Sequence, residues 1–296
     1  MTAEARPGLS VILVNYNDEA HLGTCLTSLA AHPPSGPHEV IVVDNASTDG
    51  SALAGAARFP DVRFIFNREN RGFGAANNQA VRESGGGLLL FLNTDTEVTA
   101  GALDLLRDAL VASPAAAAAG PALLRGTGEF QVSFGNRVDF FGQTIQKLAL
   151  NPLYGRRLKR MRLAREVGWL SAACLLVRRE AFEAAGGFDE GFFIYFEDID
   201  LCRRMRKAGG KLLFVPAARI VHEGGAATAS RKAGSRLEYR KSQLRYYRKH
   251  GPKVSWRLLR AAMRLNIALA RLAGRFRGED GRVLLAEYRK LLGEKT

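Results

Sequence analysis

Three carboxylates follow an aromatic run in the stretch FFIYFEDIDLCRRMR, residues 192–206. In one interpretation, Asp198 caps a helix and Asp200 lies in its first turn, because acids there complement the helix dipole. Basic residues 203–207 then fill the later turns, and Gly209-Gly210 ends the helix. That interpretation leaves Glu197 and the aromatic run without a role. In the alternative, one carboxylate is a general base at the edge of a pocket, and this stretch alone does not decide between the two.

Four apolar runs in the first hundred residues are expected to form the strands that position such a site. They cover residues 9–16, 39–45, 62–68 and 88–95, and helix-like patterns separate them. This alternation predicts an α/β fold with a mostly parallel, Rossmann-like sheet and helices on both faces. Ligands of such sheets bind beyond the carboxyl ends of the strands. The polar residues expected there are Asn15-Tyr16-Asn17-Asp18, Asp44-Asn45, Asn67-Arg68 and Asn93-Thr94-Asp95.

The loops at these strand ends exclude two common nucleotide sites. NYNDEAH has no glycine after the first strand, so the dinucleotide fingerprint is absent, and so is the Walker pattern. In the loop 67–80, Arg71 and backbone N–H groups at a helix start can meet an anion, although a solvated loop with a helix-starting glycine fits equally well. Asp95 ends a buried strand, where a carboxylate is costly unless it is hydrogen-bonded or holds a cation. We favour metal ligation by Asp95 over a turn-forming role.

Composition bounds the class of protein. The chain has 296 residues, of which 47% are hydrophobic, so it can bury a large core. Its three cysteines match no metal-ligand spacing, which indicates buried thiols in a reducing compartment. No signal-peptide pattern and no apolar run of about 18 residues is present, which predicts a cytoplasmic protein.

Charge is distributed unevenly around a net value of +14. Residues 1–120 contain 7 Lys and Arg against 13 Asp and Glu, whereas residues 230–296 contain 19 against 5. This asymmetry predicts an anionic partner for the C-terminal part: a membrane surface, a nucleic acid or a phosphorylated lipid.

Several segments between residues 9 and 225 resemble, in the same order, those of inverting family-2 glycosyltransferases with the GT-A fold, especially the bacterial rhamnosyltransferase-like branch. The resemblance is carried by VILVNYND, VIVVDNASTDGS, NRGFGAANN, FLNTDTEV, WLSAACLLVRREAFEAAGGFDEGFF, YFEDIDLCRR and IVHEGG. It implies transfer of a sugar from a nucleotide diphosphate donor. The branch suggests dTDP-rhamnose, and UDP- and GDP-sugars fit the same residues. The acceptor would be a glycan or a polyprenyl-linked glycan of the cell envelope.

The resemblance also implies roles for individual residues on the donor side. The nucleotide base would lie near Asn15, Tyr16, Asn17 and Asp44, with Asp44 accepting a hydrogen bond from a pyrimidine ring. Asn70, Arg71 and Gly72 would line the nucleotide site. The family's DxD element reads Asn93-Thr94-Asp95 here, so an amide replaces its first carboxylate. A histidine after an apolar strand is by itself more often structural, but the family places a metal ligand there, which implies that His222 binds Mg²⁺ or Mn²⁺ together with Asp95.

On the acceptor side, the resemblance assigns the general base to Asp198, beside Glu197. An inverting transfer needs one base for the acceptor hydroxyl and no second carboxylate as nucleophile. Trp169 and Ser171 would lead an acceptor-side strand over 169–179, although Trp169 fits a core position equally well. Residues 128–143 are expected to form acceptor-side structure. The basic run between Arg156 and Arg165 is expected to be a solvated loop, with a phosphate-gripping lid as the alternative.

The C-terminal region lies outside the resemblance. Residues 254–278 predict a helix with arginines on one face and apolar side chains over much of the rest. This pattern is typical of an interfacial helix on anionic lipid, and a helix docked on the catalytic domain fits it equally well. We expect no nucleic-acid binding, because no known nucleic-acid motif is present. The arginines are Arg257, Arg260, Arg264, Arg271 and Arg275.

We therefore predict a glycosyltransferase domain over residues 1–229, with a nucleotide-binding half (9–120) and an acceptor and catalytic half (121–229). A basic helical region, 230–296, follows. The rival interpretations are a catalytically silent nucleotide-sugar-binding module, for which Asn93 is the hint, and a sugar-nucleotide pyrophosphorylase. The second would need a glycine-rich loop after the first strand, and NYND is not one.

Overall fold

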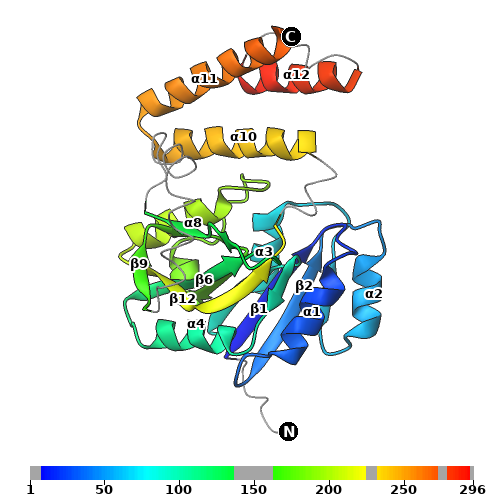
Figure 1. Cartoon of the computed structure of the whole chain (residues 1–296), viewed down its shortest axis with the longest axis vertical. Helices are drawn as coiled ribbons and strands as arrows, with labels where there is room; N and C mark the ends of the chain where they lie inside the picture. Colours follow the sequence, from blue (N-terminus) through cyan, green and yellow to red (C-terminus); the bar gives the residue numbers. More distant parts are fainter. Residues whose placement is uncertain (1–7, 137–162, 225–231, 273–278, 294–296) are drawn as a thin grey trace.

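The computed structural model describes residues 8–136, 163–224, 232–272 and 279–293. Its centre is a mixed sheet with the strand order β3-β2-β1-β4-β11-β6-β12-β5 (Figure 1). The first four strands pair in parallel, as predicted. They are β1 (Leu9–Asn15), β2 (His38–Asp44), β3 (Arg63–Phe66) and β4 (Leu88–Asn93). Their carboxyl ends therefore lie at one edge of the sheet, where the polar tips meet.

The other half of the sheet contains antiparallel pairs. β11 (Cys174–Arg178) runs antiparallel to β4 and to β6 (Ala116–Leu124). β12 (Lys211–His222) is parallel to β6, and β5 (Thr96–Val98) lies antiparallel to the end of β12. Short strands complete the fold: β7 (Phe130–Gln131) pairs with β6, β9 (Arg165–Val167) with β12, and β8 (Phe134–Gly135) with β10 (Trp169–Leu170).

The expected continuous strand over residues 169–179 is wrong. β10 ends at Leu170, and β11 begins only at Cys174. Between them the chain turns because its backbone has other partners: Ser171 N donates to Ser133 O at 2.8 Å, and Ala172 N donates to a side chain of a neighbouring helix. This break places residues 171–173 at the carboxyl edge of β4.

Helices cover both faces of the sheet. On β1, Val11 and Leu13 face one apolar cluster, and Ile12 faces the other, as the two-residue period of a strand requires. The first cluster includes side chains of α1 (Leu22–Ala31) and α4 (Ala102–Val111). The second includes α3 (Phe73–Arg82), α7 (Arg179–Ala184) and α8 (Glu197–Lys207), and α2 (Ser51–Arg58) packs beside α1 and β3.

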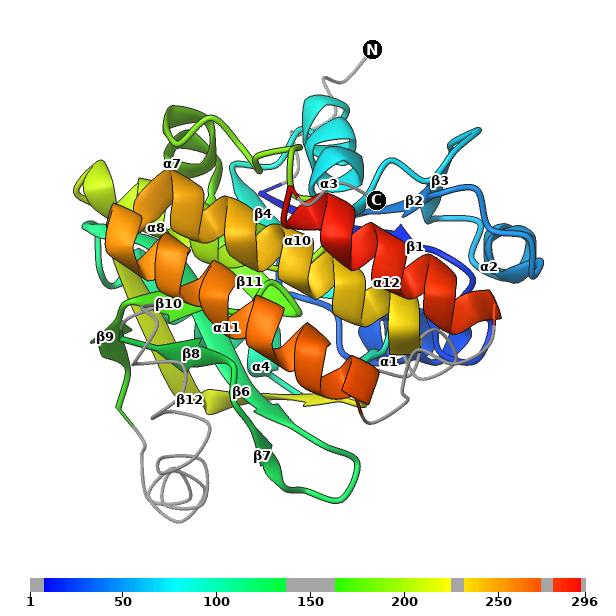
Figure 2. The same ribbon diagram turned by 90° about the horizontal axis from the view of Figure 1, so that it is seen from above.

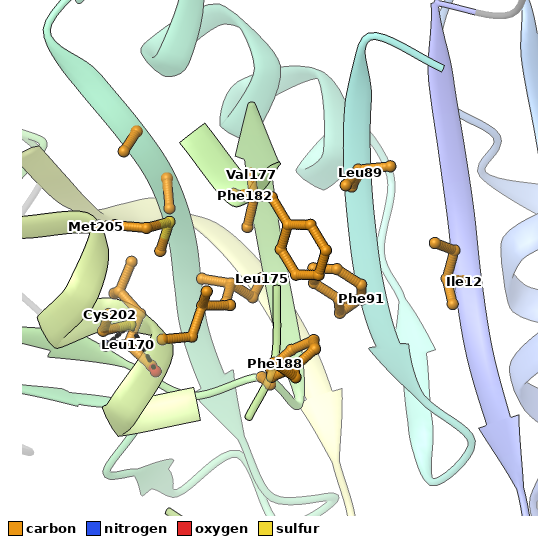
Figure 3. Close-up of a cluster of buried hydrophobic side chains, with 14 of the residues drawn as sticks. Ile12, Leu89, Phe91, Leu170, Leu175, Val177, Phe182, Phe188, Cys202 and Met205 are labelled. Atoms are coloured by element: carbon orange, nitrogen blue, oxygen red, sulfur yellow. Dashed lines mark hydrogen bonds between the residues drawn. The ribbon is translucent and has the colours of Figure 1, made fainter. Parts of the chain in front are cut away.

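Figure 3 shows the second cluster, in which Phe91 of β4 packs on Phe188 with ring centroids 4.9 Å apart. Cys202 of α8 packs there, with its Sγ accepting a hydrogen bond from Leu170 N at 3.4 Å. All three cysteines are buried and unpaired, as predicted. The apolar packing fixes the height of α8 over the sheet.

Three further helices form a layer over the carboxyl edge of the strands (Figure 1). They are α10 (Lys232–His250), α11 (Lys253–Leu272) and α12 (Glu279–Leu291). Seen from above, the three run side by side over the region that holds α8 and β11 (Figure 2). One apolar cluster joins this layer to the rest of the protein. In it, Phe192 and Phe196 pack against α10, and Leu259 and Met263 of α11 pack against α10 as well. None of the helices in the described segments is long and apolar enough to cross a membrane.

Candidate active site

Helix α8, which carries the predicted base, starts from an unusual backbone conformation. Tyr195 and Phe196 both have positive φ, 70° and 68°, which is rare for bulky residues and is found mainly at functional sites. Phe196 occupies the N-cap position, and the helix begins at Glu197. The interpretation of Asp198 as the N-cap is therefore wrong, because the N-cap lies two residues earlier, at Phe196. Asp198 lies in the first turn. The helix ends at Lys207, and Gly209 with its positive φ follows, as predicted.

Asp198 is held by two backbone N–H groups. Its Oδ2 accepts from Ala172 N at 3.2 Å, and its Oδ1 accepts from Ile199 N at 2.7 Å. Burial raises the pKa of Asp198, and these hydrogen bonds oppose the rise. An ionised Asp198 with a raised pKa is a stronger proton acceptor than an ordinary surface aspartate.

Glu197 lies in a drier environment than Asp198. It is 6% exposed, and its Oε2 has no hydrogen-bond partner among the described residues. Burial, and then the charge of Asp198, raise the pKa of Glu197 well above its usual range. In the pair, burial disfavours the charged form of Glu197, whereas two backbone N–H groups stabilise the charged form of Asp198.

Asp200 differs from both because the nitrogen atoms of three basic side chains surround it. Its carboxylate lies 2.7 Å from Arg204 Nε, 2.8 Å from Lys249 Nζ and 2.6 Å from His250 Nε2. Burial raises the pKa of Asp200, but the hydrogen bonds from His250, Lys249 and Arg204 outweigh it and hold the pKa well below its usual range. Asp200 is thus a permanent anion inside the protein.

At the first two strand tips, the predicted donor residues are tied to one another. Asn15 is fully buried, and its Nδ2 donates to Asp44 Oδ1 at 2.9 Å and to Ser51 Oγ at 2.8 Å. Asp44 also accepts from Ser47 N at 3.0 Å. Asn15 and Asp44 therefore shape the loop after β2. Sequence reasoning missed the role of Ser47, which follows the strand in the motif DNASTDGS and marks a turn.

The neighbouring loops meet this edge through amide side chains. Asn67 Nδ2 donates to Asn45 Oδ1 at 3.0 Å, and Asn45 Nδ2 donates to Gly72 O at 3.2 Å. Gly72 has a φ of 82°, and a Cβ there would lie 2.5 Å from Phe193 O, so only glycine fits. The remaining predicted donor residues lie on the same loops. Tyr16, Asn17 and Asn70 are half-buried, and Arg71 is exposed with Nη1 3.2 Å from Gln79 Oε1.

The predicted metal ligands, Asp95 and His222, lie together because β5 pairs with the end of β12. Asp95 Oδ1 is 3.2 Å from His222 Nε2, and both side chains are nearly buried. Burial raises the pKa of Asp95, and His222 lowers it, with a net fall below the usual value. Gln131 Oε1 lies 2.6 Å from His222 Nδ1, a contact that sequence reasoning missed because residues 128–143 were expected to be on the acceptor side.

This arrangement fits a divalent cation. With Nδ1–H donating to Gln131, Nε2 keeps its lone pair on the side of Asp95, which is the tautomer that a metal ligand needs. No group of three or more His, Cys, Asp or Glu side chains that would hold a metal occurs in the described part of the chain. Asp95 and His222 would supply two ligands, and a Mg²⁺ site with so few protein ligands is completed by substrate phosphates and water.

A second histidine–carboxylate pair stands beside the Asn93-Thr94-Asp95 element. Asp18 is 6% exposed and accepts from Thr94 Oγ1 at 2.6 Å, while His21 Nδ1 lies 2.5 Å from its other oxygen. Sequence reasoning noticed Asp18 as a tip residue but missed His21, whose only signal was its place three residues later at a helix start.

The backbone of residues 171–173 connects the donor and acceptor sides. Asn93 N donates to Ala173 O at 2.9 Å, and the preceding residue, Ala172, holds Asp198. Ser171 is half-buried beside them. Trp169 is half-buried against the core, and its Nε1 has no partner within the described segments. Apart from Arg165, the basic run from Arg156 lies outside the described residues.

The carboxyl edge of the sheet brings together the predicted base, Asp198, the predicted cation ligands, Asp95 and His222, and the buried polar tips of β1, β2 and β4. Such an arrangement can hold an anionic, polar donor and remove a proton from a second substrate.

Comparisons with known proteins show the family of the chain. Residues 10–186 match the family described as glycosyl transferase family 2. The chain is 33% identical over 253 residues, 79% of this chain and 82% of the relative, to an N-acetylglucosaminyl-diphospho-decaprenol L-rhamnosyltransferase of Mycobacterium tuberculosis. It is 46% identical over 56 residues, 19% of this chain and 21% of the relative, to rhamnosyltransferase WbbL of Escherichia coli K12.

Among solved structures, the mannosyltransferase PcManGT from Pyrobaculum calidifontis, in complex with GDP-Man and Mn²⁺, has a TM-score of 0.57 and 19% identity, covering 98% of this chain and 86% of that one. GalNAc-T7 with UDP, GalNAc and Mn²⁺ has the same TM-score at 18% identity, covering 74% and 44%. These structures confirm the predicted GT-A fold. The family match and the mycobacterial relative confirm the predicted membership: the chain belongs to glycosyl transferase family 2 and is rhamnosyltransferase-like.

Proposed function

We propose that the protein is an inverting, metal-dependent glycosyltransferase that moves rhamnose, or another hexose, from a nucleotide diphosphate donor to a lipid-linked glycan in cell-envelope polysaccharide synthesis. The observation that carries this proposal is the position of Asp198 in the first turn of α8, joined through Ala172 and Ala173 to the Asn93-Thr94-Asp95 element. The mycobacterial relative, which by its name transfers L-rhamnose to N-acetylglucosaminyl-diphospho-decaprenol, supports the sugar and the class of acceptor.

In the proposed reaction, Asp198 takes the proton of the acceptor hydroxyl as that oxygen attacks the anomeric carbon. The bond from the anomeric carbon to the diphosphate oxygen breaks on the opposite face, so the configuration inverts. Burial and the charge of Asp198 raise the pKa of Glu197, which favours its neutral form and so reduces charge repulsion beside the base. The N–H groups of Ala172 and Ile199 hold the carboxylate in place before the substrate arrives.

On the donor side, the nucleotide base would lie against Tyr16 and Asn17, at the loop that Asn15 and Asp44 shape. The backbone around Gly72 and the guanidinium of Arg71 would meet the nucleotide. Asp95 and His222 would hold a divalent cation, which when bound offsets the negative charge that develops on the diphosphate leaving group. Both structural neighbours contain Mn²⁺, which supports the class of ion.

A panel of nucleotide sugars tests the proposal. We expect saturation-transfer NMR and thermal shift to detect dTDP-rhamnose in preference to UDP- and GDP-hexoses, and only when Mg²⁺ or Mn²⁺ is present. The bound donor should then be consumed when a polyprenyl-diphosphate-linked GlcNAc acceptor is added, with inversion at the anomeric carbon. Donor binding without transfer to any lipid-linked or free glycan would favour the silent binding module.

We also propose that the tail helices bring this reaction to the cytoplasmic surface of an anionic membrane. α11 has two opposite apolar faces. Its inner face, which includes Leu259 and Met263, is buried against α10. Its outer face exposes five large apolar side chains, each at least 45% exposed. They are Val254, Leu258, Leu265, Leu269 and Leu272. The exposed arginines Arg257 and Arg271 flank this stripe, as in interfacial helices.

In the folded protein, not all of the arginines predicted from the sequence are available to lipid. Arg260 lies 4.6 Å above the Trp256 ring and bonds to Leu292 O, so it serves the contact between α11 and α12. Arg275 lies outside the described residues. The apolar stripe, rather than a row of five arginines, is therefore the main contact surface that we propose. The tail layer covers the carboxyl edge of the strands, so a lipid-linked acceptor would approach the site from the same side (Figure 1).

Vesicle sedimentation tests this surface. The protein should sediment with anionic vesicles and less with neutral ones, because each arginine near the headgroups is worth about 1 kcal/mol and salt screens it. The double change Leu265→Ser and Leu269→Ser should release the protein. Leu53→Ser is the matched control, since Leu53 is 70% exposed on α2. Release by the control as well, sedimentation of the double variant at the wild-type level, or a dimer that buries the stripe in solution would each contradict the proposal.

A further inference from the structure

The C-terminal helix α10 contacts the catalytic helix through a buried ionic cluster. Asp200 is fully buried in α8, two residues after Asp198, and it receives Lys249 Nζ at 2.8 Å and His250 Nε2 at 2.6 Å from the end of α10. The His250 side chain is itself only 4% exposed. A further hydrogen bond joins the two helices: Arg203 Nη2 of α8 donates to His250 O at 3.1 Å.

The same end of α10 holds the loop that leads into α8. Lys249 Nζ also lies 2.6 Å from Asp189 Oδ2, and Arg245 Nη2 lies 2.9 Å from Asp189 Oδ1. Lys249 therefore joins two carboxylates that flank the aromatic run 192–196. A single lysine in this position fixes the distance between the loop and the first turn of α8.

The aromatic run is held along its length by the same helix. Ser242 Oγ donates to Ile194 O at 2.7 Å, and Phe196 packs on Tyr246 with ring centroids 5.5 Å apart. On its other side, Phe193 O accepts from Phe73 N at 2.8 Å, next to Gly72 of the donor loop. The run FFIYF thus lies between α10, the donor loop and the base, which answers why aromatic residues precede the carboxylates.

These contacts bear on the strained residues before the base. Tyr195 and Phe196 keep positive φ only where surrounding contacts over-determine the backbone. α10 supplies such contacts on both sides of them, at Ile194 and at Asp200. Without them, the first turn of α8 would be free to relax, and Asp198 would move with it.

We propose that Lys249 and His250 are positioning residues, which set the place of Asp198 by binding the buried Asp200 carboxylate and the loop before α8. This rests on the proposed function in that Asp198 acts as the base. α10 is then a support of the active site and not an appendage. A shift of about 1 Å in a catalytic group can cost about 100-fold in rate.

Steady-state kinetics of the full-length protein test the positioning role. His250→Ala and Lys249→Met should each lower kcat by about 10- to 100-fold, with the donor KM within about twofold of wild type. His250→Gln should recover most of the lost turnover, because its amide can donate to Asp200 where the imidazole did. Arg248→Met is the matched control. Arg248 is exposed on the same helix, and no ion pair of it is found among the residues that the structure describes.

Hydrogen exchange separates this proposal from the proposed function. Amides of the first turn of α8 should exchange faster in His250→Ala and Lys249→Met, whereas those of β1 and β4 should not change. Exchange can be measured even if the protein turns over no donor. In that case the proposed function is wrong, and the exchange rates alone test the positioning role. Wild-type kcat in both variants, equal losses in His250→Gln and His250→Ala, or a loss that lies in donor KM would overturn the positioning role. If His250→Ala unfolds globally, Lys249→Met decides.

Discussion

Asp198→Asn is expected to lower turnover by roughly 100- to 10,000-fold, the range that a general base contributes. The amide keeps the size of the side chain, and its oxygen can still accept from Ala172 N. It cannot take a proton from the acceptor hydroxyl. Because the base acts on the acceptor and not on the nucleotide, donor affinity should stay close to wild type.

The measurement pairs steady-state transfer with calorimetry of the nucleoside diphosphate. Asp61→Asn is the matched control, because Asp61 is exposed just before β3, at the amino ends of the strands. Turnover of Asp198→Asn within about threefold of wild type would remove Asp198 from the mechanism. Equal loss of donor binding would mean that Asp198 belongs to the nucleotide site.

Local sequence patterns predicted the four parallel strands correctly, because apolar runs and turn residues define those strands. β1 to β4 are short apolar runs between turn residues, and their parallel order follows from alternation with helices. The strand tips therefore converge as predicted, with Asn15 beside Asp44 and Asp95 at the end of β4. The prediction of a continuous strand over 169–179 is wrong because backbone N–H groups at the turn donate to Asp198 and Ser133. The periodicity of the sequence does not show these contacts.

Contacts between distant parts of the chain were beyond sequence reasoning. Gln131 and His222 are 91 residues apart, and His250 and Asp200 are 50 apart. Each of these side chains has an ordinary local role, so only the folded chain shows that it completes a site. α11 shows a different limit. Its periodicity gave one amphipathic helix, whereas packing on α10 uses one apolar face and leaves the opposite one exposed. The proposed division at residue 229 stays a prediction.

Asp95→Ala and His222→Ala are each expected to weaken cation-dependent donor binding by about 10- to 100-fold or more, since loss even of a side chain that orients a metal ligand costs that much. Both side chains are proposed to hold the same ion, with 3.2 Å between Asp95 Oδ1 and His222 Nε2. The two effects should therefore be less than additive in the double variant, because removal of one ligand already displaces the ion. Binding measured without any divalent cation should be equal in all variants and wild type.

Calorimetry of a nucleoside diphosphate, titrated with and without Mn²⁺, measures these affinities directly. His38→Ala is the matched control, because His38 is an exposed histidine at the amino end of β2. With Nδ1–H donating to Gln131, the lone pair on Nε2 of His222 can ligate a cation, whereas an ion pair with Asp95 needs a proton on Nε2. If His222→Ala binds Mn²⁺ and nucleotide as tightly as wild type and only loses thermal stability, the histidine is a structural partner of Asp95. The ion would then be held by Asp95 and the diphosphate alone.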